Sequence, residues 1–293
     1  MIHVLQNNKF RIGIQTKGAE LCSIVSKSSF REFMWNGNPE IWGSYSPVLF
    51  PIIGSLKNGE YLFKGKTYSV PKHGFIRNHE NLKVNHISEN CVQFSLKYDE
   101  LTLLSYPFKF EFFVRYILIN NSITIEHEII NHCSENPMYF SLGGHPAFKC
   151  PINEEEAYED YYLEFEKVEK VDTWEVLSNG LINASTRSLL DNSNRLELTN
   201  NLFENDALII KEHLSKKVSL KSQKSTQTIT LEYSDFPYLG IWAKPGGKFV
   251  CIEPWLGISD SFDTDQDFET KEGIIKLDAN SNFKASYKIV IEE

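Results

Sequence analysis

The stretch FEFFVRYILINNSITIEHEIIN, residues 110–131, decides the fold class. Apolar residues such as Phe112 and Val114 recur at every second position, which is the side-chain period of a β-strand. Asn120 and Asn121 then supply two residues that tolerate positive φ, and the alternation resumes after them. The stretch therefore predicts a long β-hairpin.

The same period of two recurs along the chain in short runs separated by Gly, Asn, Asp, Ser or Pro. These runs are FRIGIQT (10–16), ELCSIVSK (20–27), YLFKGKTYSV (61–70), CVQFSLKY (91–98), TQTITLEY (226–233), KFVCIEPW (248–255) and NFKASYKIVIEE (282–293). They predict an all-β protein built as an antiparallel sandwich. Helical signals are few: DELTLLSY (99–106) has a leading acid and a leucine cluster, and the acidic run INEEEAYEDYY (152–162) is typical of a turn or loop. No internal repeat or linker interrupts the chain, so we expect a single domain over residues 1–293.

Composition excludes several classes of protein. The 293 residues are 41% hydrophobic and 13% aromatic, which is enough to bury a sizeable core. The 30 basic residues are outnumbered by 39 acidic ones and are scattered, so a nucleic-acid partner is not expected. The five cysteines form no C-x-x-C pair, which indicates free thiols in a reducing compartment. The start MIHVLQNNKF lacks the features of a signal peptide, and no run approaches the ~20 apolar residues of a membrane helix, so we expect a cytoplasmic protein without a membrane partner.

Two apparent motifs do not satisfy their chemical requirements. HEIINH (127–132) places its second histidine one position too late for a zinc-binding H-E-x-x-H helix, and it lies in a strand-like run. We therefore expect no metal site, and His127 is interpreted as a core histidine with one hydrogen bond. The glycine pairs at 143–144 and 246–247 lack the spacing of a phosphate-binding loop.

Five polar residues interrupt the strand pattern in four separate places. PKHGFIRN contains His73 and Arg77, GGHPAF contains His145, NDALI contains Asp206, and CIEPWLG contains Glu253. Each has an ordinary structural explanation, because a turn histidine is often solvated, an aspartate often caps a turn and a glutamate often ends a strand. Residue type and spacing alone leave both interpretations open.

Five sequence blocks, in order along nearly the whole chain, resemble the aldose 1-epimerase (galactose mutarotase) superfamily, and especially its LacX-like branch. The blocks are PVLFPIIGSLKNGEY (47–61), KHGFIRN (72–78), SLGGHPAF (141–148), LFENDALI (202–209) and CIEPWLGISD (251–260). The resemblance implies a large twisted antiparallel β-sandwich with few short helices.

The resemblance also implies roles for these residues. Glu253 is then the general base and His145 the general acid, while His73 and Asp206 contact the sugar. Arg77 either contacts the sugar or pairs with a structural carboxylate.

The implied reaction needs no redox step and no cofactor. A base takes the proton from O1 of the sugar while an acid protonates the ring oxygen O5; the ring opens, C1 turns, and the ring closes on its other face. From reference pKa values of ~4.3 and ~6.5, we expect Glu253 to be ionised and His145 protonated near neutral pH. We also expect Gly143 and Gly144 to permit an unusual backbone conformation and a close approach of the sugar.

One block departs from the family pattern. Many relatives have arginine where this chain has Ser55, so a cationic contact to the sugar is either lost or supplied by Lys57 or Arg77. Aromatic side chains near the blocks are candidates to stack on a pyranose: Trp42, Tyr45, Phe148 and Trp255.

The predicted function is that of an aldose 1-epimerase acting on a free aldose, with a small-molecule sugar as its partner, as a monomer or weak homodimer. Two alternatives stay open. One is a carbohydrate-binding or regulatory protein without turnover, and the other is a sugar-phosphate 1-epimerase, for which Lys57, Lys72 and Arg77 are the available cations.

Overall fold

A computed structural model describes all 293 residues, and β-strands make up most of its regular structure. The largest sheet has 15 strands, and 13 of them pair in one continuous path. In path order they are β4 (Val48–Leu49), β12 (Leu142–Gly144), β20 (Phe249–Leu256), β19 (Tyr238–Trp242), β16 (Leu208–Ile210), β14 (Tyr161–Val176), β17 (Lys217–Ser222), β18 (Thr228–Glu232), β22 (Asn282–Glu292), β10 (Ser122–Asn131), β9 (Phe110–Ile119), β8 (Cys91–Lys97) and β7 (Lys83–Ser88). Beside this path, β13 (Ala147–Lys149) pairs with β20, and β15 (Ile182–Glu197) pairs with β14.

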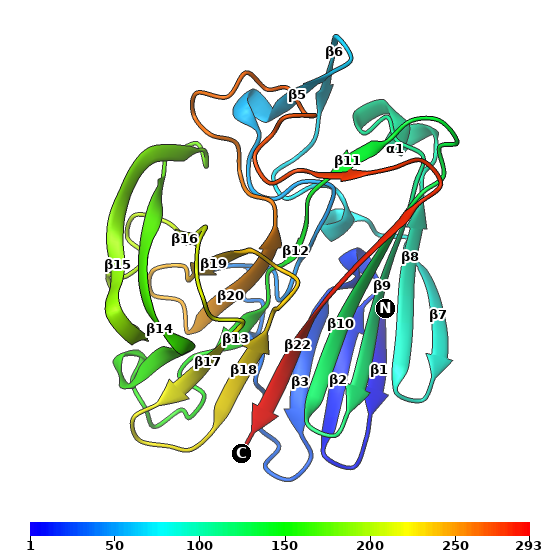
Figure 1. The fold of residues 1–293 in the computed structure, drawn as a ribbon. Helices are drawn as coiled ribbons and strands as arrows, with labels where there is room; N and C mark the ends of the chain where they lie inside the picture. Colours follow the sequence, from blue (N-terminus) through cyan, green and yellow to red (C-terminus); the bar gives the residue numbers. More distant parts are fainter.

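The large sheet bends around the interior of the molecule. Figure 1 shows β14 and β15 on one side, the long strands β7 to β10 on the other, and β17, β18 and β22 connecting the two sides. Strands β12, β19 and β20 lie between the two sides in the view of Figure 1, and in the pairing order they follow β14 and β16 toward β4. The all-β, twisted antiparallel architecture expected from the sequence is confirmed.

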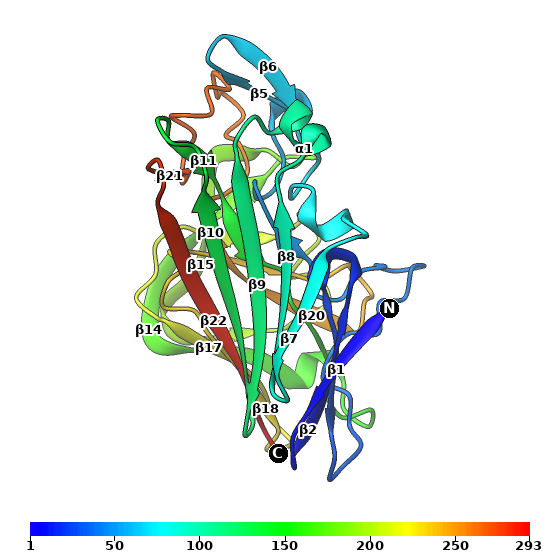
Figure 2. The ribbon, with the colours of Figure 1, turned by 90° about the vertical axis from the view of Figure 1, so that its right-hand side faces the viewer.

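Three small sheets complete the architecture. The first consists of β1 (Ile2–Gln6), β2 (Phe10–Gln15) and β3 (Leu21–Ser26), which lie beside the long strands in Figure 2. The hydroxyl of Tyr116 on β9 donates a hydrogen bond of 2.6 Å to the carbonyl of Ala19, which ties the connection between β2 and β3 to the large sheet. The other two sheets pair β11 (Met138–Phe140) with β21 (Ile275–Leu277) and β5 (Glu60–Phe63) with β6 (Lys66–Ser69).

The hairpin that the sequence predicts at residues 110–131 is confirmed as β9 and β10. Asn120 lies in the turn with φ of +53°, and Ile119 pairs with Ser122 across it. The alternating residues of β9, among them Phe112 and Val114, are fully buried. The period of two was sufficient to predict this hairpin because one face of each strand packs on the core.

The structure contains one α-helix, α1 (Glu100–Ser105), within the DELTLLSY run. Asp99 caps it: the Thr102 amide donates to the Asp99 carboxylate at 2.7 Å, while the Asp99 amide donates to the Thr102 hydroxyl at 2.8 Å. Four short 3-10 helices complete the helical content: η1 (Lys17–Ala19), η2 (Lys57–Gly59), η3 (Ile76–Asn78) and η4 (Tyr158–Asp160). No helix is long and apolar enough to cross a membrane.

His127 on β10 is in the core, as expected, but it lacks the expected hydrogen bond. Its ring is completely buried, and neither nitrogen has a hydrogen-bond partner. The ring centres of Phe112 and Tyr287 lie 6.2 and 6.1 Å from that of the imidazole. Burial lowers the pKa of His127 to about 3, so the imidazole is neutral at pH 7.

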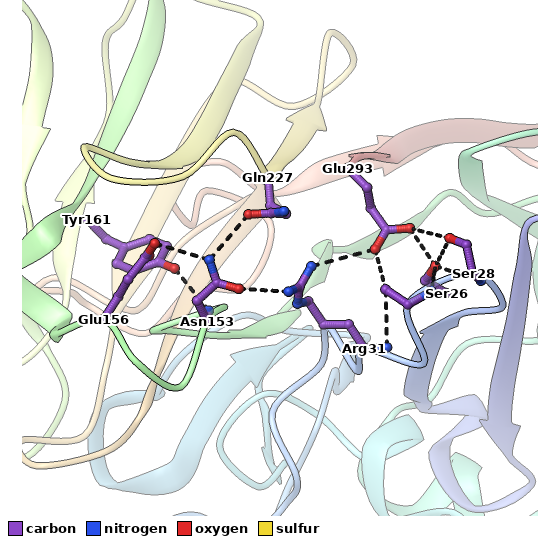
Figure 3. Close-up of polar contacts among 9 residues, drawn as sticks. Ser26, Ser28, Arg31, Asn153, Glu156, Tyr161, Gln227 and Glu293 are labelled. Atoms are coloured by element: carbon purple, nitrogen blue, oxygen red, sulfur yellow. Dashed lines mark hydrogen bonds and ion pairs between the residues drawn. The ribbon is translucent and has the colours of Figure 1, made fainter.

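A polar network joins the last residue, Glu293, to two distant segments (Figure 3). The Glu293 carboxylate accepts hydrogen bonds from the hydroxyls of Ser26, at the end of β3, and Ser28 in the turn that follows. Arg31 lies 3.7 Å from the same carboxylate and donates a 2.7 Å hydrogen bond to the Asn153 side chain. The network connects the β3 turn, the segment before β14 and the end of β22.

Candidate active site

His145 and Glu253 come together because of strand pairing around β20. Gly143 on β12 pairs with Trp255, and Ala147 on β13 pairs with Cys251. This register places His145, midway between the two pairs, opposite Glu253. Nε2 of His145 lies 3.2 Å from Oε2 of Glu253, and the two residues are only 7% and 1% exposed.

The paired glycines lack the unusual backbone conformation expected from the sequence. Neither Gly143 nor Gly144 has a positive φ. A Cβ on Gly144 would lie 2.5 Å from the Tyr287 hydroxyl, and one on Gly143 would lie 2.9 Å from the Pro254 carbonyl. Glycine is therefore required here because neighbouring core atoms leave no room for a side chain.

Two tryptophans fix the orientation of the His145 ring. Trp42 stacks on the imidazole with ring centres 5.0 Å apart, and Trp242 approaches edge-on at 5.9 Å. The Trp42 segment is held by a 2.8 Å hydrogen bond from the indole of Trp35 to the Trp42 carbonyl. Trp242 could not be predicted from the sequence as a site residue, because its strand contains no polar residue that would mark the site.

His73 reaches the same place from a tight turn. Its backbone has φ of +65°, its amide donates to the Gly54 carbonyl at 2.8 Å, and its Nδ1 accepts from the Gly54 amide at 3.1 Å. These bonds place the His73 ring 5.6 Å from that of His145. The next residue, Gly74, has φ of +77°, and a Cβ there would lie 2.0 Å from the Phe50 carbonyl, so only glycine fits.

A cavity of about 330 Å³ opens beside the His145–Glu253 pair. Its volume is that of a small-molecule site. It is lined by Trp42, Gly54, Lys72, His73, Arg77, His145, Val176, Gly180, Asp206, Ala207, Ile209, Trp242, Glu253, Trp255 and Ser259. The structure thus brings all five polar candidate residues of the sequence analysis into one cavity. Of the four aromatic candidates it places Trp42 and Trp255 there, whereas Phe148 is in the core and Tyr45 does not line the cavity.

Asp206 lies at the exposed side of the cavity, just before β16. Its φ is +75°, and its carboxylate accepts a 2.8 Å hydrogen bond from the Ala207 amide. This local turn directs a carboxylate toward the cavity from the strand layer that carries β14 and β15.

Two cations, Lys72 and Arg77, line the cavity, and neither forms an ion pair within 4.0 Å. Arg77 donates a 3.3 Å hydrogen bond to the Ser44 hydroxyl; burial lowers its pKa against the opposing charges of Glu20 and Glu253. Lys57, the other cation considered in place of the missing arginine, donates instead to the Thr264 carbonyl at 3.1 Å and does not line the cavity.

Ser55 lies next to the cavity and not in it. It lines an adjoining cavity of about 500 Å³, together with Asn58, Asn179 and Lys72. Gly180 lines the first cavity and separates Ser55 from it, since a Cβ on Gly180 would lie 2.5 Å from the Ser55 hydroxyl. Lys72 is the residue that borders both cavities.

The charge states of the central pair differ from those expected from reference values. Burial raises the pKa of Glu253 well above its ordinary value, and the charge of Asp206 raises it further against the opposing charge of Lys72. Burial, with the positive charge of Arg77, lowers the pKa of His145 to about 3. Both shifts disfavour charge, so they favour a neutral pair with its proton on Glu253 over the ionised Glu253 and protonated His145 that the reference pKa values predict.

The chain belongs to the aldose 1-epimerase family, whose model matches residues 1–268. Among curated proteins it is 35% identical to protein LacX of Lactococcus lactis subsp. lactis, over 98% of each chain. Among solved structures it matches a galactose mutarotase related enzyme from Lactobacillus acidophilus, with 37% identity, a TM-score of 0.94 and coverage of 100% of this chain and 98% of the other. A galactose mutarotase-like protein from Lactobacillus casei ATCC 334 matches with 30% identity, a TM-score of 0.93 and full coverage of both chains.

Proposed function

We propose that the protein is a cofactor-independent aldose 1-epimerase that interconverts the α and β anomers of a free aldose. The observation that carries the proposal is the contact of 3.2 Å between His145 Nε2 and Glu253 Oε2 beside a cavity of about 330 Å³. Anomer exchange needs an acid and a base at adjacent oxygens, O5 and O1, and a contacting acid–base pair has the required spacing.

The shared proton of the pair gives a balanced mechanism. In ring opening, Glu253 takes the proton from O1, His145 gives its proton to O5, and the C1–O5 bond breaks. The charged pair thereby becomes the neutral pair that burial favours. After C1 turns about the C1–C2 bond, Glu253 returns a proton to the carbonyl oxygen, His145 takes the O5 proton, and the C1–O5 bond forms on the other face.

The shifted pKa values of Glu253 and His145 contribute to catalysis in this cycle. The low-polarity site stabilises the neutral pair that accompanies the open-chain sugar. Hydroxyl groups of the cyclic sugar can hydrogen-bond to both members of the charged pair, and Lys72 and Arg77 stabilise its Glu253 carboxylate. The barrier between the two states is then lower than in water, where no fixed pair exchanges protons with both oxygens.

Replacement of either member of the pair tests the proposal. Glu253→Gln and His145→Asn should each lower kcat for mutarotation by roughly 10²–10⁴, the usual contribution of a positioned acid or base. The measurement is polarimetry of freshly dissolved α-glucose and α-galactose, with circular dichroism to verify folding. Glu135→Gln and His132→Asn, which change the same residue types on the exposed surface, are controls and should retain the wild-type rate. Near wild-type mutarotation in either site variant would refute its role.

A second candidate, a sugar-phosphate 1-epimerase, is favoured by one observation. Lys72 borders both cavities and forms no ion pair, so a phosphate on the sugar would meet a free cation there. Polarimetry with phosphorylated aldoses decides between the candidates. A kcat/KM that is much higher for a sugar phosphate than for the free aldose, and that falls in Lys72→Met, would identify the sugar phosphate as the substrate. Sugar binding without anomer exchange on any tested aldose would instead indicate a binding or regulatory protein.

A further inference from the structure

Cys251 lies directly behind the acid–base pair. It is two residues before Glu253 on β20, so both side chains point to the same face of the strand. The Cys251 thiol is completely buried, is free of any disulfide and takes no part in the proposed anomer exchange. Its sulfur, a ring nitrogen of His145 and a carboxylate oxygen of Glu253 all lie within 4.8 Å of one another.

Two buried atoms of these residues lack a hydrogen bond of good geometry. They are His145 Nδ1 and Glu253 Oε2, the second of which faces His145 Nε2 at 3.2 Å. Buried polar atoms are normally satisfied, so unpartnered ones around a common point indicate a ligand. One sulfur, one imidazole nitrogen and one carboxylate oxygen are the donor types that zinc prefers.

We propose that His145, Cys251 and Glu253 form a binding site for a single thiophilic divalent cation, such as Zn²⁺, which blocks the acid–base pair. Tetrahedral zinc, with bonds of about 2.0–2.3 Å, holds its ligand atoms roughly 3.3–3.7 Å apart. Since the three donors lie within 4.8 Å of one another, those farthest apart need to approach by up to about 1 Å on binding. The cavity provides the entry path to His145 and Glu253, which both line it.

Charge balance supports occupation by a divalent ion. A thiolate and a carboxylate together carry two negative charges, which a divalent cation neutralises in a buried site, and coordination itself removes the thiol proton. Mg²⁺ and Ca²⁺ require sets of oxygen ligands that these residues do not supply. The bound ion occupies the electron pairs that Glu253 and His145 need for proton transfer, so it inhibits; this second part of the inference depends on the proposed function.

Cobalt provides a readout of the site that is independent of activity. The full-length protein, treated with EDTA and then dialysed, is titrated with Co²⁺. One equivalent should produce a thiolate-to-cobalt charge-transfer band in the near ultraviolet and strong visible bands of tetrahedral Co²⁺. Cys251→Ser should lose the charge-transfer band, and Cys133→Ser, a change at a cysteine outside the cavity, should keep it. A charge-transfer band that persists in Cys251→Ser, or the absence of this band in the wild type, would refute the proposed metal site.

Polarimetry then tests inhibition. Zn²⁺ should inhibit mutarotation of the wild type, EDTA should reverse the inhibition, and EDTA alone should not lower activity, because the proposed proton transfers use no metal. Cys251→Ser should remain active and require at least about tenfold more Zn²⁺ for the same inhibition. Unchanged zinc sensitivity in this variant overturns the inhibitory role.

The two proposals fail in different ways. A cobalt band that depends on Cys251, in a protein without mutarotase activity, keeps the metal site and refutes the enzyme. Normal mutarotation without such a band keeps the enzyme and refutes the metal site. If Cys251→Ser does not fold, Cys251→Ala tests the same sulfur ligand and should also lose the charge-transfer band. His145→Asn tests the imidazole ligand and should weaken the visible bands of tetrahedral Co²⁺.

Discussion

At the scale of single residues, the His145–Glu253 pair should give a characteristic dependence of kcat/KM on pH. The active pair holds one proton. A second proton binds as His145 titrates, and because its pKa is lowered to about 3, the acid limb should lie below the ordinary glutamate value of 4.5. The pair loses its only proton on the alkaline side, at a pH set by the raised pKa of Glu253.

Two charge changes should move the alkaline limb in opposite directions. Asp206 raises the pKa of Glu253, so Asp206→Asn should shift this limb to lower pH. Lys72 lowers the same pKa, so Lys72→Met should shift it to higher pH. The measurement is kcat/KM by polarimetry across the pH range. A shift of both variants in the same direction would contradict the assignment of the limb to Glu253.

The candidate residues could be found from the sequence, but their charge states could not. His145, Glu253, His73 and Asp206 interrupt alternating strands or lie in turns, and ordered blocks around them resemble a family. Their pKa shifts come from burial and from charges brought close by folding, which no local pattern contains. For the same reason the sequence identifies Cys251 only as a free thiol: its place behind the pair depends on the register of β20.

At the scale of elements, the segment after β20 is held beside the cavity by a buried ion pair. Lys271 Nζ lies 2.9 Å from the Asp260 carboxylate and donates to the Ile258 carbonyl at 2.7 Å, and the charged side chains are only 4% and 3% exposed. Asp260 also accepts from the Lys57 amide at 2.9 Å. The adjacent Ser259 lines the cavity, so this pair positions one wall of the site.

Removal of one partner of this pair should be costly. Lys271→Met leaves the Asp260 carboxylate buried without its counterion, and the free energy of unfolding should fall by about 3–5 kcal/mol. Urea unfolding followed by tryptophan fluorescence measures the loss. Lys276→Met, an exposed lysine five residues later, is the control and should change stability by less than about 0.5 kcal/mol. Equal stability of the two variants would show that the ion pair does not hold the segment.

Strands were predictable from the sequence where one face packs on the core and not where charge interrupts the pattern. The β9–β10 hairpin shows a clean period of two because its alternate residues are buried. The longest strands, β14 and β15, were not predicted, because many of their side chains are charged or polar and exposed, such as Glu166, Lys167 and Asp191. Pairing with each other and with β16 and β17, rather than local propensity, holds them in place.

At the scale of the whole molecule, buried histidines should make the protein sensitive to acid. Burial lowers the pKa values of His73, His127 and His145, so the folded state binds fewer protons at these sites than the unfolded state. Stability from each group is therefore full above the ordinary value of 6.5 and is lost as pH falls toward the folded pKa. His73 and His145 belong to the cavity, whereas His127 lies in the core of the large sheet, where its effect on stability is separable from catalysis.

His127→Leu should remove one part of this acid sensitivity. With a folded pKa of about 3 and an ordinary value of 6.5, His127 alone makes the free energy of unfolding fall by about 2 kcal/mol between pH 7 and pH 5. Leucine has a similar volume and no proton to bind, so the difference between the two pH values should shrink by that amount. Since neither ring nitrogen has a partner, the variant should also be at least as stable as the wild type at pH 7. Urea unfolding at both pH values measures this, with Ile125→Leu on the same face of β10 as the control that keeps the wild-type difference. An unchanged difference in His127→Leu would mean that the imidazole has a proton partner in the folded core.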